Sequence, residues 1–129
     1  MKNRWLLSLC LLSAVPFSAF ALGLGEIKVK SALNDPLNAT IELTGTVDAS
    51  EEQLLVNLGS EADFERLGVS KDAVLMQLRF TPQLKEHPPV IHVTSEKPIN
   101  EPVLNFVLDV QSPKAQVMRE YTVFLNPAK

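Results

Sequence analysis

The strongest constraint on the fold of this chain is a two-residue alternation of apolar and polar side chains. In LNATIELT at residues 37–44, every second residue is apolar. VLNFVLDV at 103–110 and VMREYTVFL at 117–125 repeat the pattern. Because an extended strand turns successive side chains to opposite faces, such runs predict strands with one buried and one solvated face.

Turn residues separate these runs. EIKVKS at 26–31 and the run at 37–44 lie on either side of Asn34-Asp35-Pro36, which predicts a hairpin. Pro98 and Pro102 mark another turn, ahead of the run at 103–110. Further strands are expected at VIHVTS, and at VLMQLRF with inward side chains at Val74, Met76, Leu78 and Phe80. The chain should therefore form six or seven short strands.

Helical spacing replaces the alternation near the middle of the chain. Asp48 to Glu51 has the spacing of a capping box and predicts a helix that begins near Ala49 and ends at Gly59. Its apolar stripe would be Leu54, Leu55 and Leu58.

A second, shorter helix is predicted directly after the first. It would be capped by Ser60 and ended by Gly68, with Phe64 and Leu67 pointing inward. We therefore expect a mainly-β fold: an immunoglobulin-like antiparallel two-sheet sandwich with a short helical insert at about 49–67. An α+β sheet with the helices on one face is the alternative.

The first 21 residues have the pattern of a secretory signal peptide. Lys2 and Arg4 precede an apolar run, and small residues at Ala19 and Ala21 suit a signal peptidase. The run is too short for a membrane-spanning helix, which needs about 20 apolar residues. We predict cleavage after Ala21, a single β domain at 22–129, a periplasmic location and no membrane span in the mature chain.

Composition excludes several kinds of site. The only cysteine, Cys10, lies in the predicted signal peptide, so the mature chain would have no disulfide and no thiolate ligand. The formal net charge is −3 and becomes −5 once Lys2 and Arg4 are removed. Without a basic cluster, nucleic acid is not an expected partner.

No catalytic or metal-binding constellation assembles from the sequence. His87 and His92 are the only histidines, and we interpret them as surface residues, since no cysteine joins them. Acidic pairs such as Glu51-Glu52 lie at predicted helix starts, where the helix dipole favours them. We therefore expect no catalytic residue, no cofactor and no metal: the protein is not an enzyme.

Arg119-Glu120-Tyr121 is the chemically densest triplet of the chain. The alternation places Arg119 and Tyr121 on the inward face of their strand and Glu120 on the other. An inward guanidinium needs a partner, and Asp109 and Glu101 are the candidate carboxylates. The strand edges offer a further way to bind a protein.

Four stretches together resemble one protein family. They are LGLGEIKVKSALNDPLNATIEL at 22–43, LLVNLGSEADFERLGV at 54–69, IHVTSEKPINEPVLNF at 91–106 and REYTVFLNP at 119–127. In this order they resemble the N-terminal periplasmic domain of the FimV/HubP/TspA proteins of Gram-negative bacteria. The resemblance implies a scaffold linked to type IV pilus assembly, twitching motility, secretin assembly or marking of the cell pole.

This resemblance predicts a non-catalytic periplasmic adaptor that binds envelope proteins, such as a pilus secretin or alignment protein. It leaves open whether the chain is a stand-alone relative or the head of a longer protein. We select Glu101, Asn105, Arg119 and Tyr121 as candidate partner-binding residues, and expect them to have a structural role first. The alternatives are a domain that binds peptidoglycan or other carbohydrate, and a single-domain periplasmic chaperone.

Overall fold

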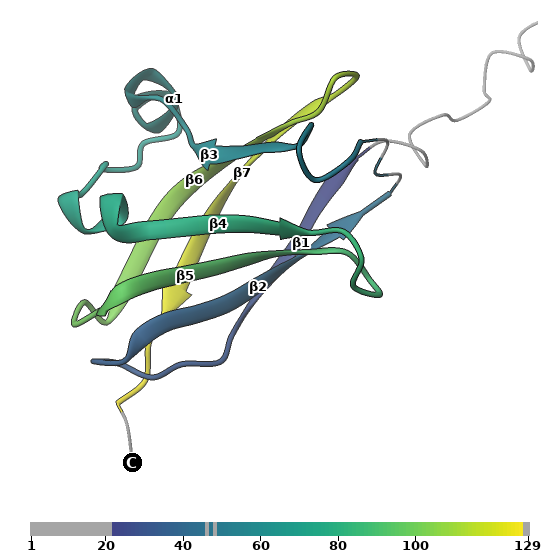
Figure 1. Ribbon diagram of the computed structural model, residues 1–129. Coiled ribbons are helices and arrows are strands. Elements are labelled where there is room, and N and C mark those ends of the chain that lie inside the picture. The colour runs from purple at the N-terminus through teal and green to yellow at the C-terminus, as the bar shows by residue number, and fades with distance from the viewer. Residues whose placement is uncertain (1–21, 46, 48, 128–129) are drawn as a thin grey trace, which may run out of the picture.

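The computed structural model describes residues 22–45, 47 and 49–127, which form a two-layer β-sandwich (Figure 1). The predicted signal peptide and its cleavage site, together with Asp48, lie outside these residues. The strands are β1 (Gly23–Val29), β2 (Pro36–Thr44), β3 (Leu55–Leu58), β4 (Leu78–Gln83), β5 (Val90–Pro98), β6 (Val103–Gln111) and β7 (Gln116–Phe124). A helix α1 (Glu61–Arg66) and a 3-10 helix (Ala73–Gln77) lie between β3 and β4.

The two sheets are antiparallel and differ in size. The larger has the strand order β1-β2-β5-β4, and the smaller has the order β3-β6-β7. Four strands facing three in this order is the arrangement of immunoglobulin constant domains. In Figure 1 the larger sheet lies in front of β6 and β7 as a separate layer. The structure thus confirms the predicted immunoglobulin-like sandwich.

Alternation in the sequence produces the core. Leu37, Ala39, Ile41 and Leu43 of β2 are buried, while their neighbours point to solvent or are half-buried. The alternate residues of β6 behave in the same way. Facing apolar sides of two sheets then bury each other, which is the main source of stability in such a sandwich.

Three aromatic rings join the layers at the centre. Phe106 of β6 is fully buried, with its ring centroid 5.9 Å from that of Phe80 on β4 and 5.7 Å from that of Tyr121 on β7. Both ring pairs are tilted, an arrangement that aromatic quadrupoles favour over flat stacking. Phe106 therefore packs against both sheets at once.

The first predicted helix is wrong. Residues 55–58 form β3, whose Leu55 and Leu58 pair with Gln111 and Leu108 of β6. The capping signal instead forms a single turn, in which the Ser50 carbonyl accepts from the N–H of Gln53 at 3.0 Å. Pairing with β6 supplies more backbone hydrogen bonds than an isolated turn could, so tertiary contacts override the local helical signal.

The second predicted helix is confirmed as α1. Ser60 caps it: the Ser60 Oγ accepts from the Asp63 N–H at 3.1 Å, and the Asp63 Oδ2 accepts from the Ser60 N–H at 2.9 Å. Phe64 is buried, and Gly68 ends the helix with a φ of +73°. Leu67, however, is 40% exposed, because the helix ends one residue before it.

The segment between β3 and β4 covers the outer face of the smaller sheet. Val107 lies among outward-facing residues of β6 but is fully buried, and its carbonyl accepts from the Gly59 N–H at 2.9 Å. The ammonium of Lys71 lies 5.5 Å from the centre of the Phe64 ring. This insert thus extends the core to the outside of the sheet.

The predicted strand at 74–80 begins later than expected. Residues Ala73–Gln77 form the 3-10 helix, so Leu75 is buried and Met76 is 72% exposed. The change of period reverses which of these two side chains points inward. Leu78 of β4 is buried and Phe80 is half-buried, as predicted.

None of the helices in the described part of the chain is long and apolar enough to span a membrane.

Candidate functional site

Contacts join three of the four residues selected from the sequence: Asn105 bonds to the Tyr121 carbonyl, and Arg119 lies against the Tyr121 ring. Asn105 lies on β6, and Arg119 and Tyr121 lie on β7, where Asn105 is opposite Thr122 in the register. Asn105 faces outward, whereas Tyr121 is buried. Glu101 lies exposed in the turn between β5 and β6, and none of the contacts found within residues 22–45, 47 and 49–127 joins it to the other three.

Arg119 and Tyr121 connect the two sheets. The Tyr121 hydroxyl donates to the Gly25 carbonyl at 2.6 Å, and the Arg119 guanidinium donates to the Leu24 carbonyl at 2.8 Å. The register of β1 with β2 shifts between Leu24 and Ile27, which marks a β-bulge. A bulge disrupts the ladder locally, and these two side chains of β7 satisfy carbonyls of β1 at that point.

The prediction that a carboxylate, Asp109 or Glu101, would pair with Arg119 is wrong. Its guanidinium bonds to the Leu24 carbonyl and lies 5.1 Å from the centre of the Tyr121 ring. Asp109 instead accepts from the side chains of Gln111 and Gln116. Arg119 is also exposed rather than buried on the inward face as predicted, so its guanidinium needs no carboxylate to offset a desolvation cost.

Burial controls the ionisation of Tyr121. It raises the pKa of the phenol to about 12, while the positive charge of Arg119 acts in the opposite direction. At neutral pH the hydroxyl is therefore a donor, as its bond to Gly25 requires. Such a neutral, hydrogen-bonded tyrosine is a structural group rather than a proton-transfer group at this pH.

Asn105 organises the outer face of β6 and β7. Its Nδ2 lies 3.0 Å from Glu120 Oε2, 3.1 Å from Thr122 Oγ1 and 2.9 Å from the Tyr121 carbonyl. The amide therefore holds two neighbouring side chains of β7 in place. Glu120, which the alternation places on this outward face, was not among the candidate residues selected from the sequence.

A hollow of about 250 Å³ separates the facing edges of β1 and β7. Glu26 and Ile27 line it from β1, and Arg119 to Thr122 line it from β7. It holds two carboxylates and the guanidinium that bonds to Leu24. This chemistry suits an extended polypeptide better than a small apolar ligand.

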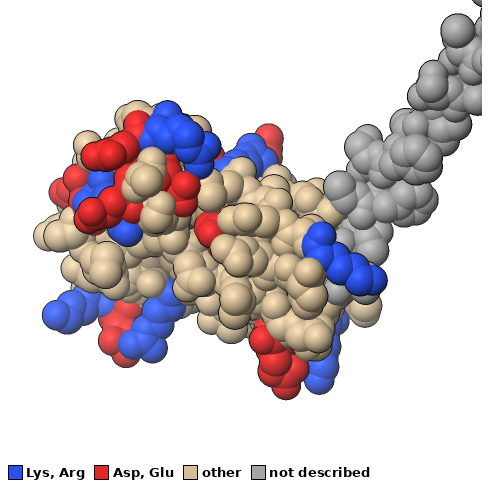
Figure 2. Space-filling model, turned by 90° about the horizontal axis from the view of Figure 1, so that it is seen from above, with Lys and Arg blue, Asp and Glu red and all other residues tan. Residues whose placement is uncertain are grey.

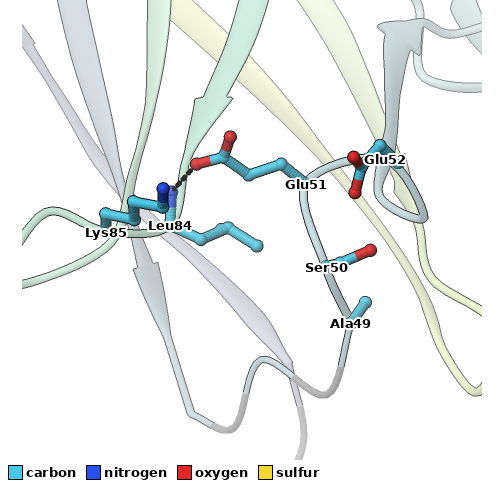
Figure 3. Close-up of a pocket in the computed structure, with 6 residues that line it drawn as sticks. All are labelled: Ala49, Ser50, Glu51, Glu52, Leu84 and Lys85. Atoms are coloured by element: carbon cyan, nitrogen blue, oxygen red, sulfur yellow. Dashed lines mark hydrogen bonds between the residues drawn. The ribbon is translucent and has the colours of Figure 1, made fainter.

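A second hollow, of about 340 Å³, lies between the loop after β2 and the turn after β4. Figure 3 shows Glu51 reaching across it, where its Oε2 accepts from the Leu84 N–H at 2.8 Å, whereas Glu52 lies on the far side of the loop. Lys85 completes the lining. The bond joins the two loops, which gives Glu51 a structural role.

The histidines lie apart from these hollows. The Nε2 of His92 is 2.8 Å from the Asn38 Oδ1 across β5 and β2, and His87 lies in the turn after β4. Within the described ranges no three His, Cys, Asp or Glu residues are grouped to hold a metal ion. The absence of a metal site in the whole protein stays a prediction.

Charged side chains of both signs mix over one end of the molecule. Figure 2 shows red and blue atoms together at the end that carries α1, beside a broad uncharged centre. Glu61, Asp63, Glu65 and Arg66 all belong to α1. Asp63 and Arg66 form an ion pair at 2.9 Å, so part of this charge is satisfied locally.

An exposed apolar pair is the feature that the sequence reasoning missed. Phe124 of β7 is 66% exposed, and its cross-strand neighbour Val103 of β6 is 49% exposed. Phe124 is an even number of positions from Met118, Glu120 and Thr122, so the alternation places all four side chains on the same, outward face. The alternation, followed to the end of β7, is therefore the signal that could have located Phe124.

Comparison with known proteins identifies relatives. Residues 22–128 match the family described as the FimV N-terminal domain, an Ig-like domain. Two curated proteins named motility hub protein FimV, from Pseudomonas aeruginosa strains PAO1 and UCBPP-PA14, are each 46% identical over 110 residues. The alignment covers 84% of this chain but 12% of each relative's length. No solved structure matches the chain. From the sandwich, the family match and this identity, we conclude that the chain belongs to the FimV N-terminal domain family.

Proposed function

We propose that this protein is a non-catalytic periplasmic adaptor, which binds another envelope protein during assembly of a motility apparatus. A pilus secretin or an alignment protein is the expected kind of partner. The observation that carries the proposal is the 46% identity, over 84% of the chain, to proteins named motility hubs.

The contacts of the densest polar residues support a binding role over a catalytic one. Arg119 and Tyr121 direct their polar atoms to carbonyls of β1, and Asn105 directs its amide to neighbours on β7. Groups held in this way stiffen a scaffold. They are not poised against a reacting atom, as a nucleophile and its base would be.

Export and processing are part of the same proposal. The family match begins at Leu22, and Leu22 is already buried, with 9% exposure. Cleavage after Ala21 would therefore leave the whole core intact. The test is the intact mass of the protein from a periplasmic extract: a mature chain that begins at Leu22 supports export, and an uncleaved chain in the cytoplasm contradicts it.

A domain exchange tests the adaptor function directly. Residues 22–127 of this chain would replace the matching segment of FimV in Pseudomonas aeruginosa, and surface motility would be measured. We expect the chimera to restore motility to at least about half of the wild-type level, since the 46% identity would leave much of a shared binding surface in place.

The control is a chimera with an unrelated immunoglobulin-like domain of similar length. Motility from both chimeras would show that the segment is only a spacer and would contradict the adaptor proposal. Loss of motility in both, with both chimeras stably produced, would show that this chain does not carry the binding surface that the relative uses.

A carbohydrate-binding function is a second candidate, favoured by the exposed ring of Phe124. Sugars stack on exposed aromatic faces. The test is sedimentation of the purified protein with peptidoglycan sacculi. Binding that Phe124→Ala abolishes would support this function, and a protein that stays in the supernatant would exclude it.

A further inference from the structure

The sandwich has four edge strands, and three of them carry features that discourage pairing with another chain. β3 has only four residues, and β4 contains Pro82, which lacks a backbone N–H. β1 has the bulge between Leu24 and Ile27. Short strands, prolines and bulges are the usual protections of sheet edges.

The fourth edge, β7, is neither short nor interrupted by a proline or a bulge, and its charged residues are Arg119 and Glu120. It is nine residues long and contains no proline, lysine or glycine. Its register with β6 is continuous from Phe124, opposite Val103, to Gln116, opposite Gln111. A long and regular edge of this kind is a template for strand addition.

The backbone hydrogen bonds show which residues present this edge. The Leu125 N–H donates to the Pro102 carbonyl at 2.8 Å, so residues of the same parity as Leu125 face β6. Glu120, Thr122 and Phe124 therefore turn their backbone groups away from β6. In the described part of the chain, no backbone bond joins these three to a segment outside the ladder.

The same three residues present their side chains on the outer face of the smaller sheet. Phe124 supplies an exposed ring beside Val103. Asn105 holds Glu120 through Oε2 and Thr122 through Oγ1. An incoming strand would thus meet free backbone groups, an apolar side chain and a positioned carboxylate on one row.

We propose that the open edge of β7 accepts an extended strand from another exported protein, which adds to the three-stranded sheet. This inference rests on the proposed adaptor function. The partner strand would place an apolar side chain against Phe124 and a Lys or Arg against Glu120. Because Phe124 and Glu120 are four residues apart, the two partner residues would also be four apart, about 13 Å along the strand.

Charge favours a different protein over a second copy of this chain. The outward residues of β7 include Glu120 but no lysine or arginine, and Glu26 adds a second carboxylate at the hollow beside the edge. Arg119 points its guanidinium to the Leu24 carbonyl instead. Two copies paired through β7 would bring their acidic residues together, and the cation nearest that face, the Arg66 guanidinium 3.7 Å from the Met118 Sδ, is already paired with Asp63.

The test is site-specific photo-cross-linking of the full-length chain in living cells. A benzoylphenylalanine replaces Phe124, and the control carries it at Thr81, an exposed residue on the outer face of the larger sheet. The cross-linked peptide is sequenced by mass spectrometry. We expect a product from position 124 only, within a segment that has a Lys or Arg four residues from an apolar residue.

Two variants show whether the backbone of β7 makes the contact. Thr122→Pro removes an edge N–H and blocks the approach of a strand, while Thr122→Ala keeps the N–H. Cross-linking from position 124 should fall about tenfold in Thr122→Pro and stay within about twofold in Thr122→Ala, since main-chain bonds carry the affinity of strand addition.

If Thr122→Pro does not accumulate as folded protein, Glu120→Lys takes its place, with Glu52→Lys as the charge control. Glu120→Lys should lower the cross-linking several-fold, because like charges would then oppose each other, and Glu52→Lys should not. Cross-linking that survives Thr122→Pro or Glu120→Lys overturns the inference, as does a product that contains two copies of this chain.

The comparison of the two positions separates this inference from the proposed function. A specific envelope protein captured from position 81 but not from position 124 would overturn the β7 contact and leave the adaptor function standing. Absence of a specific product from both positions would contradict both.

Discussion

Tyr121 shows how a single residue can serve both layers of the sandwich. Its ring packs against Phe106 in the core, and its hydroxyl donates to the Gly25 carbonyl of the opposite sheet. The alternation of β7 predicts the inward direction of this side chain. The carbonyl that it reaches, 96 positions earlier in the chain, could not be predicted, because only folding brings β1 beside β7.

The ionisation of Tyr121 gives a prediction that one spectrum can check. The chain has one tyrosine, so phenolate absorbance near 295 nm reports this residue alone. We expect a titration midpoint of about 12 in the folded protein, against the ordinary value of 10.0 once urea has unfolded it.

The sign of the linked stability effect follows from this raised pKa. The folded state holds the phenol proton more tightly than the unfolded state. The contribution of Tyr121 to the free energy of unfolding is therefore complete below pH 10 and is lost as the pH rises towards 12. Tyr121→Phe should lack this part of the alkaline loss of stability. A midpoint near 10 in the folded protein would contradict the burial of the hydroxyl.

At the scale of elements, α1 illustrates what a local motif can specify. Ser60 and Asp63 form a reciprocal capping box, and Gly68 supplies the positive φ that ends the helix. Ser60 and Gly68 were recognised in the sequence, because a cap and a helix-ending glycine act on residues only a few positions away. The helix predicted just before α1 had a comparable capping signal, yet residues 55–58 pair with β6 and form the strand β3 instead.

The capping box makes α1 sensitive to acid. The Ser60 backbone N–H, followed by Arg66, lowers the pKa of the Asp63 carboxyl below its usual 3.8. Because its pKa is lowered on folding, the ionised Asp63 carboxylate stabilises the folded state above pH 3.8. This stabilisation is lost as the pH falls through the pKa that Asp63 has in the folded protein. Asp63→Asn should therefore flatten the acid limb of the stability profile, measured by urea unfolding from neutral pH down through the acid range.

Removal of the serine cap is the companion change. Ser60→Ala should cost about 1 kcal/mol of unfolding free energy at neutral pH, the usual value for an N-cap. Ser70→Ala, at an exposed site beyond the helix, is the matched control. Equal losses from both variants would show that the capping bond does not stabilise α1.

The edge of β7 predicts an alternating pattern of backbone hydrogen exchange. The N–H groups of Tyr121 and Val123 face β6 and should exchange slowly, while those of Glu120 and Thr122 face the open edge. We expect the rates of the two sets to differ by about a hundredfold in the free protein. Uniform protection along β7, measured by NMR, would mean that the edge is already paired.

At the scale of the whole molecule, stability depends on packing between the sheets. Phe106 is fully buried and contacts rings from both layers. Phe106→Ala should cost about 3–5 kcal/mol, a large part of the roughly 5–15 kcal/mol that holds a typical domain together. Phe106→Leu should cost less, about 1–2 kcal/mol.

The matched control is Phe124→Leu, the same chemical change at an exposed position of the neighbouring strand. Its effect on the urea midpoint should be small, within about 0.5 kcal/mol. If both substitutions to leucine shift the midpoint equally, Phe106 does not have the central packing role that its position indicates.

The features that could be predicted from the sequence are those that arise from neighbouring residues. Alternation specified the strands and their buried faces at β2, β6 and β7, and the Ser60 box specified α1. These patterns are readable because a pleat or a cap involves residues only two or three positions apart.

The features that could not be predicted are those that depend on residues distant in the sequence, and these follow from the tertiary structure. It turned residues 55–58 into a strand, gave Arg119 a carbonyl instead of a carboxylate, and left β7 as the longest regular edge. Each outcome depends on which strand lies beside which, and that is settled by the joint burial of two sheets. The neighbours of a strand cannot be predicted from the composition of that strand, because the stabilising contacts are made with residues of the other sheet.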